Sequence, residues 1–366
     1  MSEVPLMPPL QRPLAVAEVM LSKGFGGAER SFVDTCLALA ERGHRVLAVC
    51  ETRFQRRGDL EAASGVEVRA VRCRGRWDRW CTRAIRRAVA DFGADVTHSH
   101  LARAAWMTGV ALRGSGVPLV CKMHNYAKLA NYAAVDHFIG TTPDQRRYLR
   151  EAGIADDRIS VIPNFSRVPA AASPREPQDG PLRLITLGRL HEVKGHDVLL
   201  RALRLAVDGG ADVRLTVGGD GDEAAPLRRL CGELGLADRV EFAGRQTDAS
   251  AFLDGGDVFV LPSRSESFGI ALLEAMARGL PVVSTRTKGP WQILGEDGAW
   301  WADCEDPASL ALAIVAAAAD PGGRRRRAAR SLEVFRTRYS EAAVVDRLVD
   351  LFRAIRGDAA APRAAA

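Results

Sequence analysis

Residues Ser263 to Gly279 read SRSESFGIALLEAMARG and follow an apolar run that ends at Leu261-Pro262. The apolar run predicts a buried strand, and the segment after it predicts a loop and then a helix from about Phe268. Glu266 would lie just before this helix, and Glu274 would lie on it among apolar and small residues. A carboxylate in such surroundings is costly to bury unless something satisfies it. The pattern therefore predicts a ligand site at the carboxyl end of a strand.

The same alternation of apolar runs with helical patterns extends along the chain on both sides of this segment. Strands are expected near residues 14–21, 45–50, 66–70, 95–99, 118–123, 137–140 and 159–162, and again near 182–187, 213–217, 240–243, 258–261 and 281–284. Such alternation is typical of an α/β fold with parallel sheets.

A proline-rich stretch without either periodicity, residues 163–181, separates the two series of strands. A chain of 366 residues is also long for one core. We therefore expect two doubly wound domains with a cleft between them. The expected parts are a first domain at 1–164, a linker at 165–181, a second domain at 182–340, a last helix at 341–357 and a disordered tail at 358–366.

The loop after the first strand of the second domain, residues 188–195, reads GRLHEVKG. Arg189 and Lys194 lie on this loop and can point at one object above the strand end. Two cations beside a helix N-terminus suit a diphosphate, although two unrelated surface cations remain the alternative.

The next strand of this domain passes into GGDGDE at residues 218–223. Asp220 and Asp222 invite a divalent-metal interpretation. The glycines instead favour close approach of the backbone to a ligand, and Asp222 is expected to cap the following helix. We predict no metal site here.

A glycine-rich turn, GFGGAE at residues 24–29, links the first strand to the first helix. Its glycines would allow the backbone to approach an anion at the helix N-terminus. The turn partly matches a dinucleotide-binding fingerprint, but Glu29 stands where the third glycine is required. A nicotinamide cofactor is therefore disfavoured, and no cofactor is predicted.

Four motifs occur in order: Gly-Gly-Ala-Glu at 26–29, Val-Ile-Pro-Asn at 161–164, Gly-Arg-Leu-x-Glu-x-Lys-Gly at 188–195, and Glu266-x7-Glu274. Together they resemble glycosyltransferase family 4, over residues 14 to about 355. The resemblance implies the GT-B fold, in which two Rossmann-like domains face each other across a cleft. It also implies transfer of a sugar from a nucleotide-sugar donor with retention of anomeric configuration.

The resemblance also implies roles for individual residues. Arg189 and Lys194 would bind the donor diphosphate, Glu266 the donor sugar and Glu274 the nucleotide ribose. His124 resembles a histidine that faces the donor sugar, although Asn125 departs from the usual threonine and a structural histidine stays possible. The other residues expected to bind the donor are Gly26, Gly27, Gly188, Gly218, Ser267, Phe268, Gly269 and Ile270. The last helix of the family packs back on the first domain.

Two further histidines, His98 and His100, alternate on the expected fourth strand. We expect them to face opposite sides of the sheet, so that they cannot ligate one metal ion. His100 is the better candidate to line the acceptor side, and a structural role is the favoured alternative for both.

The net charge of +6 is concentrated in one segment, Arg69 to Arg87, which holds eight arginines, Trp77, Trp80 and a single acidic residue, Asp78. This segment is either a solvated helix face or a surface for an anionic acceptor or membrane headgroups. Nucleic acid is disfavoured because the charge is local. The seven cysteines are never closely paired, which indicates buried thiols. We expect a cytoplasmic protein, free or peripheral on the inner face of the membrane.

The predicted function is retaining, metal-independent transfer of a hexose, with UDP-hexose the favoured donor. The bias toward arginine and alanine is typical of GC-rich bacterial coding, so the expected acceptor is a cell-envelope glycan or a lipid-linked sugar such as lipopolysaccharide core. The alternatives are a nucleotide-sugar 2-epimerase of the same architecture and a non-catalytic nucleotide-sugar-binding protein.

Overall fold

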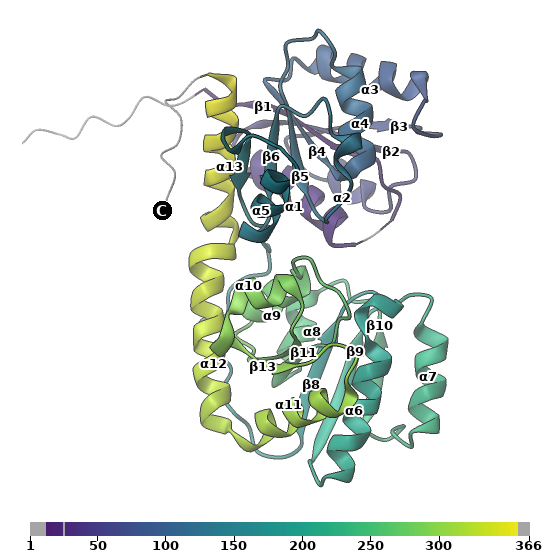
Figure 1. Cartoon of the computed structure of the whole chain (residues 1–366), viewed down its shortest axis with the longest axis vertical. Helices are drawn as coiled ribbons and strands as arrows, with labels where there is room; N and C mark the ends of the chain where they lie inside the picture. Colours follow the sequence, from purple (N-terminus) through teal and green to yellow (C-terminus); the bar gives the residue numbers. More distant parts are fainter. Residues whose placement is uncertain (1–11, 25, 358–366) are drawn as a thin grey trace, which may run out of the picture. The chain divides into compact units, whose positions relative to one another are not determined.

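The computed structural model describes residues 12–24 and 26–357, coloured along the sequence in Figure 1. Within these residues the chain forms two compact units. One comprises residues up to 123 together with 127–139 and 348–357, and the other comprises 124–126 and 140–347. The tail predicted at 358–366 lies outside the described residues.

The first sheet has seven strands in the order β3-β2-β1-β4-β5-β6-β7. Strand β1 pairs in parallel with β2 on one side and with β4 on the other. In turn, β2 pairs in parallel with β3, and β4 pairs in parallel with β5. Chain order thus reverses at β1 and β4. The strands are Ala15–Met20 (β1), Arg45–Glu51 (β2), Val66–Val71 (β3), Val96–His100 (β4), Leu119–Met123 (β5), His137–Gly140 (β6) and Ile159–Val161 (β7).

An α-helix follows each of β1, β2, β3, β4 and β6, which gives the crossover connections that parallel strands need. Residues 348–356 of the last helix also pack in the first unit, where Arg356 donates to Asp95 at 2.9 Å and Phe352 lies edge-on to His98. The helices are Gly27–Glu41 (α1), Arg57–Glu61 (α2), Arg79–Phe92 (α3), Leu101–Ala111 (α4), Pro143–Glu151 (α5) and Glu341–Arg356 (α13).

The second sheet has six parallel strands in the order β10-β9-β8-β11-β12-β13. Chain order reverses at β8 and β11, and such a reversal marks the place where open α/β sheets bind ligands. The strands are Leu182–Leu187 (β8), Val213–Gly218 (β9), Val240–Gly244 (β10), Val258–Leu261 (β11), Val282–Thr285 (β12) and Trp300–Ala302 (β13).

The core of the second unit lies on both faces of this sheet. Leu184 belongs to one buried apolar cluster and its neighbour Ile185 to another, because successive side chains of a strand point to opposite faces. The helices are His196–Asp208 (α6), Ala224–Glu233 (α7), Ala249–Asp254 (α8), Ile270–Ala277 (α9), Lys288–Leu294 (α10), Pro307–Ala319 (α11) and Pro321–Val334 (α12). None of the helices within the described residues is long and apolar enough to cross a bilayer.

The structure confirms the two parallel α/β sheets and corrects several details. Helix α9 begins at Ile270 and not at Phe268, because Gly269 has a positive φ of 101°. Asp222 does not cap α7, whose N-cap is Glu223. Six cysteines are buried as expected, but Cys304 is exposed. Strand β13 was not predicted.

Candidate functional site

Most predicted ligand residues of the second unit lie where β8, β9 and β11 end and on the three loops that follow these strands, whereas Ile270 and Glu274 lie on α9. These strands lie side by side around the point where chain order reverses. Their carboxyl ends therefore share one edge of the sheet, and the three loops are neighbours there although they are far apart in the sequence.

The loops after β8 and β9 are bonded to each other through their backbones. Gly188 N–H donates to the Gly218 carbonyl at 3.0 Å, and Leu190 N–H donates to the Asp220 carbonyl at 2.9 Å. Gly219 has a φ of 141°, and a Cβ at this position would lie 1.8 Å from the Gly188 oxygen. Only glycine can therefore occupy position 219 without moving the loop that carries Arg189.

The loop after β8 also contacts the loop after β11. Gly195 has a φ of 67°, and a Cβ there would lie 2.2 Å from the Pro262 oxygen. Arg264 N–H donates to the Val193 carbonyl at 2.9 Å, and the Arg264 guanidinium holds both oxygens of Asp197 at 2.8 and 2.9 Å. Burial opposes ionisation of Asp197, but the bonds from Arg264 outweigh it and lower the pKa of Asp197 to about 2. This bidentate pair, which was not predicted, ties the loop after β11 to the first turn of α6.

The central contact of the site joins two predicted residues. Lys194 Nζ lies 2.5 Å from Glu266 Oε2, and the two side chains are 27% and 13% exposed. Arg189 is exposed, and within the described residues its side chain makes no hydrogen bond or ion pair. The site therefore presents one neutralised cation–carboxylate pair and one further cation at the same sheet edge.

Backbone contacts set the position of Glu266. Its carbonyl accepts from Gly289 N–H at 2.9 Å, and a Cβ on Gly289 would lie 2.5 Å from the backbone of Phe268. Gly269 is the N-cap of α9, and no side chain among the described residues caps that helix. Ser267 and Ile270, on either side of the buried Phe268 and Gly269, are partly exposed.

Glu274 lies on α9 and is 4% exposed, while the adjacent Leu273 and Ala275 have no exposed surface. The predicted setting of a carboxylate within an apolar helix is thus present. Because a buried carboxylate is stabilised by hydrogen bonds to donors, Glu274 suits a ligand that carries hydroxyl groups.

Two glycines of the predicted donor set have local packing reasons to be glycine. A Cβ on Gly218 would meet the Phe252 ring at 2.4 Å. A Cβ on Gly26 would lie 3.0 Å from a carboxylate oxygen of Glu29, whose other oxygen accepts from the Ser22 hydroxyl at 2.5 Å. Gly26 is the N-cap of α1, which begins at Gly27. The donor-binding roles of these glycines stay predictions.

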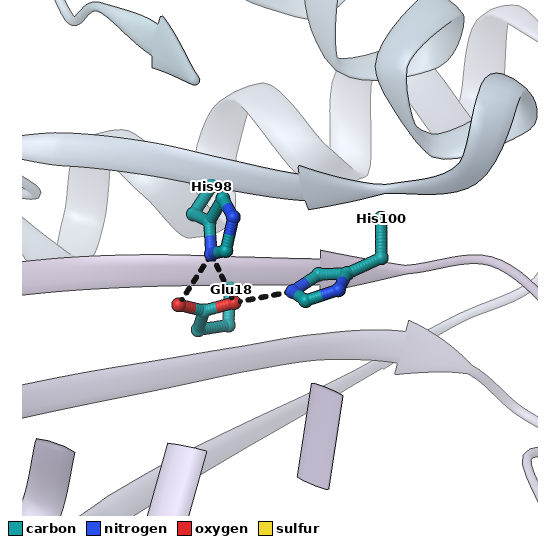
Figure 2. Close-up of side chains that lie close together, drawn as sticks. All are labelled: Glu18, His98 and His100. Carbon is teal, nitrogen blue, oxygen red and sulfur yellow. Dashed lines mark hydrogen bonds and ion pairs between the residues drawn. The ribbon is translucent and has the colours of Figure 1, made fainter. Parts of the chain in front are cut away.

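The expectation that His98 and His100 face opposite sides was wrong. Figure 2 shows both rings turned toward the carboxylate of Glu18: His98 Nδ1 lies 2.9 Å from Oε1 and His100 Nε2 lies 2.8 Å from Oε2. Residues two apart on a strand share a face, so the side chains of these histidines must point the same way. All three side chains have no exposed surface.

This buried cluster contains a fourth polar group. Lys122 on β5 is 1% exposed, and burial lowers its pKa to about 7 against the attraction of Glu18. Burial raises the pKa of Glu18, which the hydrogen bond from His100 opposes. Among the described residues, only Glu18, His98 and His100 bring three possible metal ligands together. Because Lys122 can offset the charge of Glu18, we assign no metal ion to them. His124, which was predicted to face the donor sugar, follows β5 and is half-buried, and its role stays a prediction.

Comparisons with known proteins decide the family. The family Glycosyl transferases group 1 matches residues 181–320, and Glycosyltransferase Family 4 matches residues 25–166. The lipopolysaccharide core biosynthesis glycosyltransferase LpsD of Rhizobium meliloti is 34% identical over 89% of this chain and 95% of its own length. The chain belongs to glycosyltransferase family 4.

LpsE of the same organism, also a lipopolysaccharide core biosynthesis glycosyltransferase, is 32% identical to this family 4 glycosyltransferase over 89% of the chain and 95% of LpsE. Among solved structures, Anabaena HepE in complex with UDP and glucose superimposes with a TM-score of 0.78 at 19% identity, covering 92% of this chain and 99% of HepE. A glycosyltransferase from Rickettsia africae gives a TM-score of 0.81 at 15% identity, covering 95% and 100%. The glycosyltransferase thus has the predicted GT-B fold.

Proposed function

We propose that this glycosyltransferase moves a hexose, with retention of configuration, from a nucleotide-sugar donor to a hydroxyl group of a lipopolysaccharide core or related envelope glycan. The observation that carries the proposal is the Lys194–Glu266 pair, at 2.5 Å, on the sheet edge that also holds Arg189. The names of the LpsD and LpsE relatives support the acceptor, and the UDP and glucose in HepE support a UDP-hexose donor.

In this proposal Arg189 and Lys194 bind the donor diphosphate, Glu266 binds hydroxyls of the donor sugar and Glu274 binds the ribose. The bond between the sugar C1 and the diphosphate oxygen breaks, and the acceptor oxygen bonds to C1 on the same face. The departing diphosphate takes the acceptor proton. The two cations and the open N–H groups at the start of α9 stabilise the charge of the leaving group, so the reaction needs no metal ion.

Donor binding should raise the melting temperature of the protein. A ligand that binds only the folded state at a hundred times its Kd adds about 2.7 kcal/mol, and for units of this size we expect a shift of roughly 5–10 °C. We therefore expect UDP-hexoses, in a screen that includes GDP- and ADP-sugars, to shift the transition in a thermal-shift measurement. Absence of a shift with every nucleotide sugar would contradict the proposal.

Three further experiments test separate parts of the proposal. Glu274→Gln keeps the size of the side chain but removes the carboxylate, and should reduce the shift. EDTA should leave the shift in melting temperature and the rate of donor turnover unchanged, because in this proposal Arg189 and Lys194 stabilise the diphosphate without a metal ion. Donor incubated without acceptor should keep its sugar stereochemistry, which separates a transferase from a 2-epimerase.

We further propose that the segment Arg69 to Arg87 holds the enzyme on an anionic bilayer. Trp77 and Trp80 are 79% and 77% exposed, and the arginines of α3 are exposed whereas Ile85 and Phe92 are buried. Exposed tryptophans favour the bilayer interface, and each basic residue near an anionic surface adds about 1 kcal/mol.

Vesicle flotation tests this contact. The full chain should float with phosphatidylglycerol-containing vesicles at low salt and less at high salt, and replacing both Trp77 and Trp80 by alanine should reduce the bound fraction. Leu312→Ala removes another exposed apolar side chain, 71% exposed on α11, and should change nothing. Equal flotation of the tryptophan variant and the Leu312 variant would contradict the proposed contact.

A further inference from the structure

The first unit contains a hollow of about 450 Å³ that the donor residues do not use. It lies between the residues that follow β1, including Ser22 and Lys23, and those that end β4 and begin α4, including His100, Leu101 and Arg103. Its size falls within the range of small-ligand sites. Strands β1 and β4 are also where chain order reverses in the first sheet, so the hollow occupies the position where such a sheet binds ligands.

The charged side chains that line this hollow are both cationic. Lys23 is 47% exposed and lies 4.0 Å from Glu51, at the limit of an ion pair. Arg103 is exposed, and within the described residues its side chain has no hydrogen-bond or ion-pair partner. Residues at the start of α4 also line the hollow, and no side chain among the described residues caps this helix. Each of these features favours an anion.

The base of the hollow is rigid. His100 lines it with no exposed surface, and its Nε2 lies 2.8 Å from the buried Glu18 carboxylate, which also contacts His98. The next residue, Leu101, has a left-handed φ of 69°, a conformation that costs free energy for a residue with a Cβ. Strain of this kind concentrates at ligand sites, where the surrounding contacts hold the backbone in place.

Other polar groups near the hollow do not compete for this role. The Ser22 hydroxyl donates to Glu29, so it cannot donate the same proton to a bound anion. Glu18 lies behind His100 and does not line the hollow. Arg103 and Lys23 are therefore the side chains that can bind an anion here. The guanidinium of Arg103 can donate two parallel N–H bonds to a carboxylate or a phosphate.

We propose that this hollow is the acceptor subsite and that it binds an anionic group, a phosphate or a carboxylate, carried by the acceptor sugar. The proposal rests on the proposed transferase function and adds the chemical class of the acceptor.

Titration calorimetry on the full chain tests the subsite, with the nucleotide that stabilises the protein present at saturation so that the donor site is filled. Glucose 6-phosphate and glucuronate should bind at least about tenfold more tightly than glucose, because each offers a charge to Arg103. Arg103→Ala should remove this preference. Arg113→Ala, which changes an exposed arginine just beyond the other end of α4, should keep it.

The outcomes separate this proposal from the function on which it rests. If no nucleotide stabilises the protein, the proposed function fails. If a nucleotide does, but the charged sugars bind no better than glucose, or Arg103→Ala behaves like Arg113→Ala, the subsite is wrong. If Arg103→Ala weakens flotation with phosphatidylglycerol vesicles and leaves sugar phosphate binding unchanged, the anion is a lipid headgroup and the acceptor assignment is overturned. A rise in the melting temperature of Arg103→Ala on addition of donor would show that this variant is folded.

Discussion

Lys194→Ala should lower the rate of donor turnover by about a hundredfold or more, because removal of one preorganised charge donor typically costs 10²–10³ in kcat. The Nζ atom lies 2.5 Å from Glu266, so the substitution removes a cation from the leaving diphosphate and also leaves the 13% exposed carboxylate without that cation. The rate to measure is release of nucleoside diphosphate from the donor that stabilises the protein, at saturating donor and acceptor.

The fold should survive this change. The loop is held by its backbone, in which Lys194 N–H donates to the His191 carbonyl at 2.8 Å, and the Lys194 side chain is 27% exposed. An unchanged melting temperature without donor would show this directly.

Two further variants identify the cause of the loss. Arg204→Ala breaks a cation–carboxylate pair of similar length, 2.6 Å to Asp208, on α6 away from the sheet edge, and should retain normal turnover. Lys194→Arg keeps the charge and should recover part of the rate. If Lys194→Ala turned over donor within about threefold of the unchanged enzyme, the diphosphate role of Lys194 would have to be abandoned.

The sequence was sufficient to predict the second sheet and the loops at its edge because the signals for them are local. An apolar strand, a loop and a helix follow one another between residues 258 and 277, and the neighbours of Glu274 are apolar on both sides. The alternation of strands and helices then places separate loops at one edge of a parallel sheet. The proximity of Lys194 and Glu266, although they are 72 positions apart, follows from that rule.

Other features depend on contacts that spacing cannot reveal. Glu18 lies in the run AVAEVM, which resembles an ordinary buried strand, and its partners His98 and His100 come about 80 positions later. Only the strand order, with β4 beside β1, brings them together. The shared face of the two histidines, in contrast, follows from strand geometry alone and was available from the sequence.

The same limit applies to the contacts that fix the loops. Arg264 lies in the most informative stretch of the sequence, yet its bond to Asp197 on α6 depends on how that helix begins after Gly195. Strand β13, Trp300–Ala302, is too short to show a period.

Gly219→Ala should destabilise the second unit by about 3 kcal/mol or more, because it combines a strained backbone with a collision. The φ of 141° disfavours any side chain, and the new Cβ would lie 1.8 Å from the Gly188 oxygen and 2.9 Å from the Gly188 carbonyl carbon. For a unit of this size the loss corresponds to a fall in melting temperature of roughly 6–12 °C. Scanning calorimetry of the full chain measures it.

The control is a glycine-to-alanine substitution at a position with neither a positive φ nor a collision of the new Cβ. Gly232 lies on α7, and a Cβ there would have none of the described atoms within 4 Å. Gly232→Ala should therefore be neutral or stabilise the protein by up to about 1 kcal/mol, since alanine favours a helix over glycine. Because the collision at position 219 acts on the loop that carries Arg189, Gly219→Ala should also weaken donor binding, whereas Gly232→Ala should not. Equal melting temperatures for the two variants would mean that the loops after β8 and β9 are not held as the backbone contacts indicate.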